Sequence, residues 1–204
     1  MKYRVDHIFP TEILTLDLSG EFTQLEIRSM TDHIDHMIES GQDMQLDDAT
    51  PRYQCLPVLF RENAPELFSN RLRKLFFRAC ARYLRDVKNF TVNQDAIVFT
   101  HTSAWFYCGW PEINSNSQNP WHQHAPAFLS GVFYLRNAGD PETSGTIFHD
   151  PRGPWSHASR MRYVPGTPGH LVVFPGWLYH KPMLDDNNRE KRYTIACNAY
   201  AAVR

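Results

Sequence analysis

Two histidines separated by one residue, His122 and His124, stand just before an apolar run, residues 128–135, that has the composition of a β-strand. In an extended chain the side chains alternate between two faces, so residues i and i+2 point to the same side. Neutral imidazole is among the commonest metal ligands in proteins. The pair therefore predicts a two-point clamp for a metal ion within a β-structure.

A third ligand is expected at His180, which follows the apolar residues 171–174. Further along the chain another alternating segment begins. One face of that segment would carry Arg192, Thr194, Ala196 and Asn198. An arginine at the head of an inward-facing row can bind a carboxylate through two parallel hydrogen bonds. We therefore expect an acidic co-substrate beside the metal.

The residues alone leave open what completes the metal site. One alternative is a site of three histidines. Another is a site of two histidines that is completed by water or by a distant carboxylate, and a third is a site in which His124 only shapes the pocket. Asp150 is the candidate carboxylate, although an Asp-Pro pair is also common in turns.

The order of these motifs resembles that of the iron(II)/2-oxoglutarate-dependent oxygenase superfamily. Within it the chain is similar to a small phage and bacterial group over nearly its whole length. The stretches that carry the resemblance are residues 8–11, Trp105, and residues 122–135, 148–152, 169–180 and 192–198. The superfamily more often has an aspartate where this chain has His124.

The resemblance implies the cofactors and the roles of the site residues. Fe(II) would be bound by His122, His124 and His180, with 2-oxoglutarate as co-substrate and O2 as oxidant. The implied ligands of 2-oxoglutarate are Arg192, Tyr134 and Asn198.

The expected reaction is hydroxylation of an unactivated C–H bond in a small molecule or an amino-acid side chain. One alternative is a three-histidine dioxygenase that needs no 2-oxoglutarate, because the substrate itself chelates the iron. Another is a non-catalytic, cupin-like metal-binding protein. The sequence does not identify the substrate.

The fold is expected to be mainly β with N-terminal helices: a double-stranded β-helix, or cupin-like jelly roll, buttressed by two or more α-helices. Residues 1–204 would form a single oxygenase domain. Within it, residues 1–95 would supply a first strand and the buttressing helices, and residues 96–204 the jelly-roll core with the metal site. The expected core strands are residues 96–107, 128–135, 145–148, 171–174 and 192–201.

Helix signals are confined to the first half of the chain. Thr23 and Glu26 form a capping-box pattern that begins a helix, and Gly41 ends it. A second helix begins near Asn63 with an apolar stripe that runs from Phe68 to residue 87. Between the helices we expect a loop with a short extended piece at residues 55–60, and before the first helix an extended segment at residues 5–17.

Composition excludes some partners. Lys and Arg number 21 and Asp and Glu 22, so the net charge of −1 gives no bulk attraction to nucleic acid or anionic membranes. The polar cluster at residues 32–36 and the basic face of the second helix are expected to be solvated. Without an apolar run of about 20 residues or a leader-like segment, we predict no membrane span and a cytoplasmic location. A homodimer is the default expectation, and the polar residues 112–119 are a candidate lid.

Overall fold

The computed structural model describes residues 11–45, 53–86, 96–109, 121–137, 139–152, 161–183 and 190–203. The proposed lid at residues 112–119, residues 5–10 of the first extended segment and residue 87 lie outside these ranges. No helix within the described ranges is long and apolar enough to cross a membrane.

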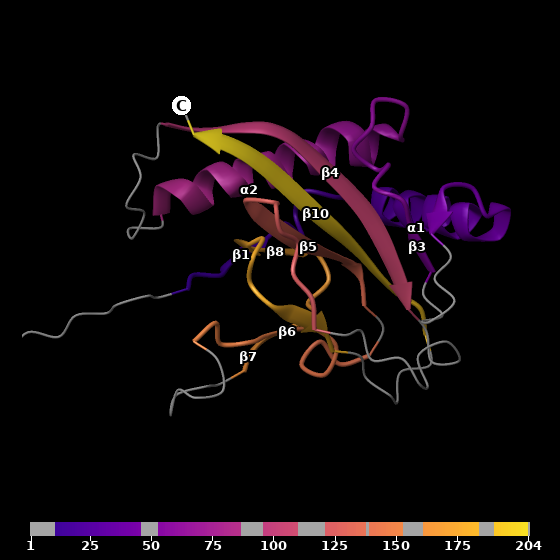
Figure 1. Ribbon diagram of the computed structural model, residues 1–204. Helices are drawn as coiled ribbons and strands as arrows, with labels where there is room; N and C mark the ends of the chain where they lie inside the picture. Colours follow the sequence, from indigo (N-terminus) through magenta and orange to yellow (C-terminus); the bar gives the residue numbers. More distant parts are fainter. Residues whose placement is uncertain are drawn as a thin grey trace, which may run out of the picture.

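Two antiparallel sheets form the body of the protein (Figure 1). The larger sheet has the strand order β1-β8-β5-β10-β4-β3-β2, and the smaller sheet has the order β7-β6-β9. The larger sheet consists of β1 (Leu14–Asp17), β2 (Met44–Gln45), β3 (Tyr53–Cys55), β4 (Ile97–Gly109), β5 (Leu129–Arg136), β8 (His170–Pro175) and β10 (Arg192–Val203). The smaller sheet consists of β6 (Thr146–Phe148), β7 (Arg162–Val164) and β9 (His180–Pro182).

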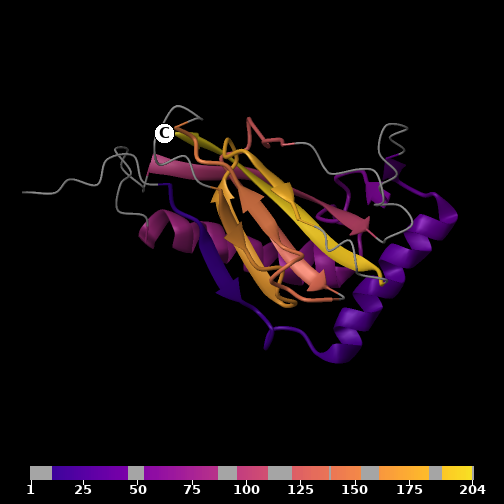
Figure 2. The same ribbon diagram turned by 90° about the horizontal axis from the view of Figure 1, so that it is seen from below.

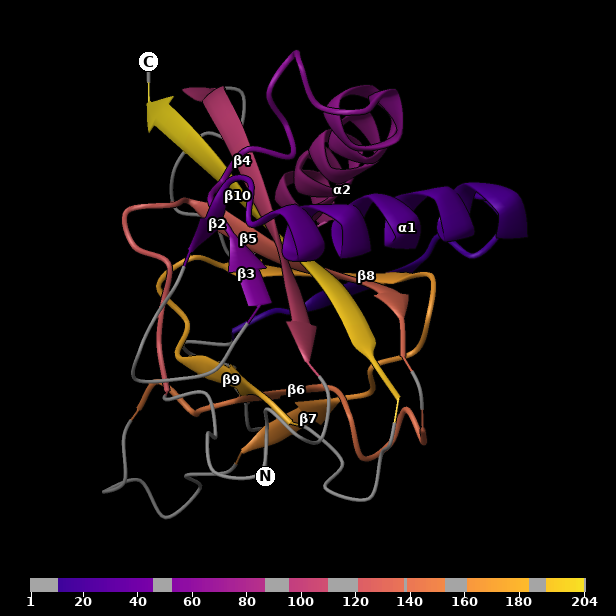
Figure 3. The ribbon, with the colours of Figure 1, turned by 90° about the vertical axis from the view of Figure 1, so that its right-hand side faces the viewer.

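Helices α1 (Gln24–Ser40) and α2 (Arg73–Asp86) lie on one side of the larger sheet, and the smaller sheet lies on the other side (Figure 3). Alternation along the central strand β10 separates two environments. Ile195, Cys197 and Ala199 are buried in the core between sheet and helices. Arg192, Thr194 and Ala196 line a cavity on the opposite face. The helices thus fill one face of the sheet, and the other face is available for polar chemistry.

The first helix begins and ends where the sequence predicts. Thr23 caps α1: its hydroxyl accepts a hydrogen bond from the Glu26 amide at 3.3 Å, and the Glu26 carboxylate accepts one from the Thr23 amide at 2.8 Å. This reciprocal arrangement satisfies two amides that the first turn leaves without helical partners. At the other end Gly41 adopts φ 70°, a left-handed conformation that glycine takes without steric cost.

The second helix starts later than the cap signal at Asn63 indicates. It opens as a π-helical segment, η1 (Leu67–Leu72), and continues as α2. The Ser69 hydroxyl donates to the carbonyl oxygens of Ala64 at 3.0 Å and Pro65 at 3.2 Å. Such side-chain bonds to preceding carbonyls compete with the regular helical pattern. The predicted apolar stripe is nevertheless buried from Phe68 to Tyr83.

The extended piece predicted at residues 55–60 is wrong in position, because the strand is β3 (Tyr53–Cys55). Pro57 lies two residues after the end of the strand, and a proline cannot donate to a sheet ladder. The chain turns there, with the Val58 amide donating to the Leu56 carbonyl at 2.7 Å. Strands β2, β7 and β9 were not predicted, since two or three residues are too few to show an alternating pattern.

The polar cluster on α1, expected to be solvated, contains a contact between elements. The Asp35 carboxylate accepts hydrogen bonds from the Tyr193 hydroxyl at 2.9 and 3.0 Å, and from the Lys191 ammonium at 2.7 Å. The His33 ring packs on Phe68 with their ring centres 5.6 Å apart. Helix α1 therefore contacts the two residues on either side of Arg192, the first residue of β10.

Gly131 on β5 supplies a direct test of the packing between sheet and helix. A Cβ atom at this position would lie 2.8 Å from Cε2 of the buried Phe76 ring on α2 and 3.2 Å from the Val172 carbonyl oxygen. We expect Gly131→Ala to lower the free energy of unfolding by about 1–3 kcal/mol, because overpacking forces neighbouring atoms to move. Urea denaturation of both proteins measures the difference.

Gly20→Ala is the matched control, because a Cβ at Gly20 would meet no atom within 4 Å. Its free energy of unfolding should stay within about 0.5 kcal/mol of the parent protein. Equal stability of the two variants would contradict the proposed packing of α2.

Candidate metal centre

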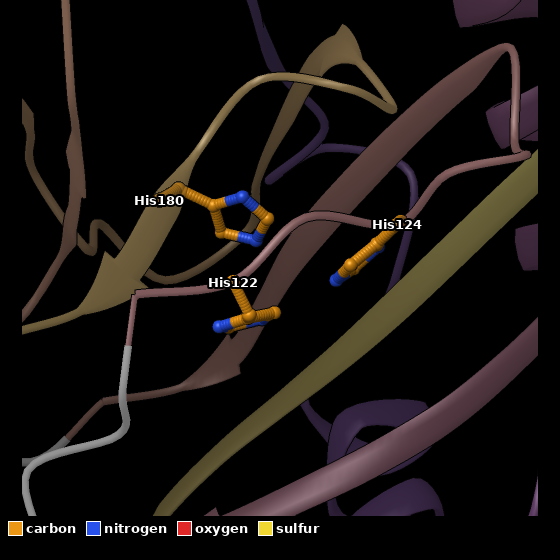
Figure 4. A group of neighbouring side chains, drawn as sticks. All are labelled: His122, His124 and His180. Atoms are coloured by element: carbon orange, nitrogen blue, oxygen red, sulfur yellow. The ribbon is translucent and has the colours of Figure 1, made fainter. Parts of the chain in front are cut away.

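The structure brings together the three histidines that the sequence proposes as ligands. One nitrogen from each of His122, His124 and His180 lies within 4.8 Å of the other two (Figure 4). The ring centres of His122 and His180 are 4.4 Å apart, and those of His122 and His124 are 5.3 Å apart. Among the described residues no Asp or Glu joins this group. Small ring rotations can therefore place three imidazoles on one ion.

Backbone hydrogen bonds hold the three histidines in position. His122 and His180 form an isolated antiparallel bridge, in which each amide donates to the other residue's carbonyl at 3.0 Å. The His124 amide donates to the Gly176 carbonyl at 2.7 Å. The clamp therefore lies beside β8 and β9 in an extended bridge rather than in a regular strand.

In two of the three histidines, a hydrogen bond at Nδ1 determines which ring nitrogen is available to a metal. In His180, Nδ1 lies 2.9 Å from the Leu178 carbonyl oxygen, and in His124 it lies 2.9 Å from Asn198 Oδ1. Both oxygens accept only, so Nδ1 carries the hydrogen in each ring and the Nε2 lone pair is left for a metal. This pattern is usual for histidines that bind metals.

Burial keeps these rings neutral. It lowers the pKa of His180 to about 3, with a smaller contribution from the neighbouring His122. It lowers the pKa of His124 to about 4, against the opposing hydrogen bond to Asn198. A metal competes with protons for the same lone pair, so depressed pKa values favour metal binding at neutral pH.

Asp150, the alternative carboxylate ligand, is engaged elsewhere. Its carboxylate accepts hydrogen bonds from Arg152, at 2.9 Å from the side-chain Nε and at 3.0 Å from the backbone amide. It is not part of the histidine group. The donor set that the described residues offer to a metal is therefore three imidazoles.

Arg192 opens onto the same cavity, which has a volume of about 300 Å³. Its guanidinium is 2% exposed, and burial lowers its pKa. Nη2 donates a long hydrogen bond of 3.4 Å to the Gly145 carbonyl, and Nε has no hydrogen-bond partner among the described residues. A buried charge without a counter-ion is costly, so this arrangement suits an anionic ligand.

Comparison with known proteins finds a family that is similar to the segment carrying this site. The family described as "Putative 2OG-Fe(II) oxygenase" matches residues 108–198, which include the three histidines and Arg192. Over this segment the chain is similar to the 2OG-Fe(II) oxygenases. No curated protein matches the chain.

Several solved structures share the fold of this protein. A prolyl-4-hydroxylase from Pseudomonas putida is 12% identical, with a TM-score of 0.60 over 93% of this chain and 92% of that one. A prolyl hydroxylase from Trichoplax adhaerens, in complex with a hypoxia inducible factor peptide fragment, is 11% identical, with a TM-score of 0.63 over 92% and 83%. The epimerase SnoN, in complex with Fe3+, alpha ketoglutarate and nogalamycin RO, is 14% identical, with a TM-score of 0.57 over 95% and 82%.

The prediction of a double-stranded β-helix with buttressing helices is thereby confirmed, as is the recognition of the superfamily. The matched family depends on Fe(II) and 2-oxoglutarate, and the histidine group of this chain has ligand chemistry that suits iron.

The other two residues proposed to bind 2-oxoglutarate lie differently from Arg192. Tyr134 is fully buried, and its hydroxyl is 2.6 Å from Thr146 Oγ1. Thr146 lines the cavity, so Tyr134 reaches it through this threonine. Asn198 contacts His124 and is not among the residues that line the cavity. The roles of Tyr134 and Asn198 in co-substrate binding stay predictions.

Several cavity residues carry no signal in the sequence. Gln54 and Thr146 come from strands of only three residues, and Val132 is one apolar residue among many on β5. Their place in the site follows from strand pairing between distant segments, which no local pattern reveals.

The depressed histidine pKa values predict how the stability of the metal-free protein responds to acid. Because the folded pKa values of His124 and His180 lie below the ordinary value of 6.5, the unfolded chain binds more protons between pH 6.5 and pH 4. Stability is therefore lost as pH falls below about 6.5, by about 2 kcal/mol per histidine between pH 7 and pH 5. Urea denaturation after chelator treatment measures this slope.

The variant His180→Gln removes one of these groups and should show a shallower loss of stability over the same pH range. An identical slope in the parent and variant proteins would contradict a neutral, buried His180.

Proposed function

We propose that the chain is an Fe(II)- and 2-oxoglutarate-dependent oxygenase in which His122, His124 and His180 hold the iron and Arg192 binds the distal carboxylate of 2-oxoglutarate. Its reaction is hydroxylation of an unactivated C–H bond, and residues 1–204 act as one domain. The observation that carries the proposal is the buried guanidinium, without a carboxylate partner among the described residues, in the same cavity as three imidazoles.

The charges of the cavity fit a dianion. Its lining residues include one charged side chain, Arg192, and no Asp or Glu among those described. A bound divalent ion at one end and the guanidinium at the other complement the two carboxylates of 2-oxoglutarate. An arginine can grip a carboxylate through two parallel hydrogen bonds, and the pair is strong where water is excluded.

Strand β10 sets the spacing between the two ends. Arg192 and Asn198, which contacts the ligand His124, are six residues apart on one face, or about 20 Å between Cα atoms at 3.4 Å per residue. The long arginine side chain spans part of this distance. Thr194 and Ala196 line the cavity between them and leave room for an elongated diacid.

The remaining part of the cavity is where we place the substrate. Gln54, Trp105 and Tyr107, from β3 and β4, line the wall next to β10. The Trp105 ring centre is 5.4 Å from that of His124. A flat aromatic wall beside the metal ligands suits a small molecule or an amino-acid side chain and keeps water away from the reacting bond.

When bound, iron and 2-oxoglutarate supply the oxidation: one atom of O2 is incorporated into succinate as 2-oxoglutarate loses CO2, and the other enters the substrate C–H bond. The chain's own residues bind and orient. The histidines fix the ion and Arg192 fixes the direction of the diacid. The aromatic wall holds the target bond close to the metal.

A three-histidine dioxygenase that acts without 2-oxoglutarate is the second candidate. The observation that favours it is the absence of a carboxylate from the histidine group among the described residues. The position of Arg192 argues against it, because a substrate that only chelates the metal would leave the buried guanidinium without an anionic partner. Succinate formed in proportion to the O2 consumed would decide for the first proposal, and O2 consumption without succinate for the second. Absence of both with every substrate pool would favour a non-catalytic metal-binding protein.

The role of Arg192 is tested by comparing two 2-oxo acids on the metal-loaded protein. 2-Oxoglutarate has a distal carboxylate and pyruvate lacks one, whereas both have the 2-oxo acid group that chelates a metal. We expect Arg192→Gln to weaken 2-oxoglutarate binding by about 30-fold or more, the effect of removing one partner of a buried charge pair. Pyruvate binding should change by less than about threefold. Titration calorimetry with Zn(II)-loaded protein gives both constants.

Thr102→Ala is a control variant for this comparison. Thr102 accepts a hydrogen bond from the exposed Arg73 at 3.1 Å and is not among the cavity residues, so both constants should stay as in the parent. Equal losses for 2-oxoglutarate and pyruvate in Arg192→Gln would argue against a specific grip on the distal carboxylate.

A further inference from the structure

Asn198 makes two hydrogen bonds through a single atom, one of them buried and the other partly buried. Its Oδ1 lies 2.9 Å from His124 Nδ1 and accepts a hydrogen bond from the Ser130 hydroxyl at 2.7 Å. Ser130 is fully buried and Asn198 is 6% exposed. The two residues are direct partners in the pairing of β5 with β10, so the sheet itself sets their separation.

This arrangement determines the state of the His124 ring. An amide oxygen can only accept, so His124 Nδ1 must donate and therefore carries the ring hydrogen. Reversing the carboxamide would place its NH2 group against Nδ1. The ring hydrogen would then sit on Nε2, and His124 would present a hydrogen to the metal instead of a lone pair. In the observed orientation the Ser130 hydroxyl donates to the same oxygen, so reversal would cost this hydrogen bond and require the hydroxyl to turn and accept from the NH2 group.

We propose that Asn198 and Ser130 are positioning residues that hold His124 as a metal ligand, with Asn198 fixing the tautomer and the direction of the ring and Ser130 fixing the carboxamide. The inference rests on the proposed metal site but not on 2-oxoglutarate binding. It replaces the direct contact with co-substrate that the sequence suggests for Asn198.

His124 is the ligand for which this support can be changed by substitution. The ring of His180 is oriented by a backbone carbonyl, that of Leu178, which every residue possesses. The ring of His124 is oriented by a side chain on another strand. Outer residues of this kind commonly change metal affinity by about 10- to 100-fold when they are replaced.

Co(II) binding to the metal-free protein tests the proposal without turnover. Its dissociation constant and visible absorption report on the ligands directly. We expect Asn198→Ala to weaken Co(II) binding by about 10- to 100-fold. Ser130→Ala, which leaves the acceptor in place but frees the carboxamide to turn, should weaken it by a smaller factor, about three- to tenfold.

Asn198→Asp is the conservative variant that separates positioning from packing. A carboxylate accepts from both His124 Nδ1 and Ser130, so Co(II) affinity should be equal to or tighter than that of the parent. Tyr200→Phe is the matched control. The Tyr200 hydroxyl lies 3.5 Å from Asn198 Nδ2, the opposite end of the carboxamide, so its loss should leave Co(II) binding within about twofold.

Folded Asn198→Ala that binds Co(II) as tightly as the parent would overturn the proposal, as would Asn198→Asp that binds as weakly as Asn198→Ala. If Asn198→Ala fails to fold, Ser130→Ala is the deciding variant. Co(II) affinity and a Co(II) spectrum in Ser130→Ala that are the same as in the parent would then overturn the proposal. Lowered 2-oxoglutarate affinity in Asn198→Ala at unchanged Co(II) affinity would also overturn it and return Asn198 to the co-substrate.

These measurements distinguish failure of the positioning role from failure of the proposed function. If the parent protein binds Co(II) with an affinity that His180→Gln does not reduce, the metal site itself is absent and both proposals fail. If the Co(II) results are as expected but 2-oxoglutarate does not bind, the positioning role stands and the proposed reaction fails.

Discussion

The burial of one guanidinium beside three imidazoles is the constraint on which the site depends. A buried charge with one long hydrogen bond is unfavourable unless a ligand completes it, and imidazoles held neutral by burial are prepared for a metal. These two features complement each other, because a cation and a dianion placed between them would satisfy both. The rest of the fold can be understood as the means of keeping Arg192 and the histidines in place.

The sheet performs this task through its central strand. β10 pairs with β4 on one side and β5 on the other, and its alternate residues face either the helices or the cavity. Seen from below, onto the face of the larger sheet, β10 lies between β5 and β4, and α2 passes behind the strands (Figure 2). The apolar core on that side supplies the burial that stabilises the domain, so the cavity side can carry polar residues. Asp35 on α1 adds a tie at the start of β10, through Tyr193 and Lys191, next to Arg192.

Much of the site could be predicted from local patterns. The spacing of His122 and His124, the apolar run before His180 and the alternation after Arg192 each follow from strand geometry, and the structure places these residues around one cavity. The capping box of α1 was equally visible because it lies within four consecutive residues.

The features that sequence reasoning missed depend on contacts between distant segments. Ser130 and Asn198 become partners only through the register of β5 with β10. In the sequence Asp35 has the pattern of an exposed helix residue, and its contacts with Tyr193 and Lys191 follow only from the position of β10 beside α1. Strand β9 has three residues, too few for a periodic signal, yet it begins with a proposed ligand. Local patterns thus predicted the ligands, whereas their supporting partners required the three-dimensional structure.

The most direct measurement of the central claim is an anaerobic optical titration of the Fe(II)-loaded protein with 2-oxoglutarate. If the histidine group binds iron and Arg192 holds the diacid next to it, a visible charge-transfer band of the chelate should grow and saturate at one 2-oxoglutarate per chain. A protein that binds Fe(II) but shows no band at any 2-oxoglutarate concentration would contradict the account.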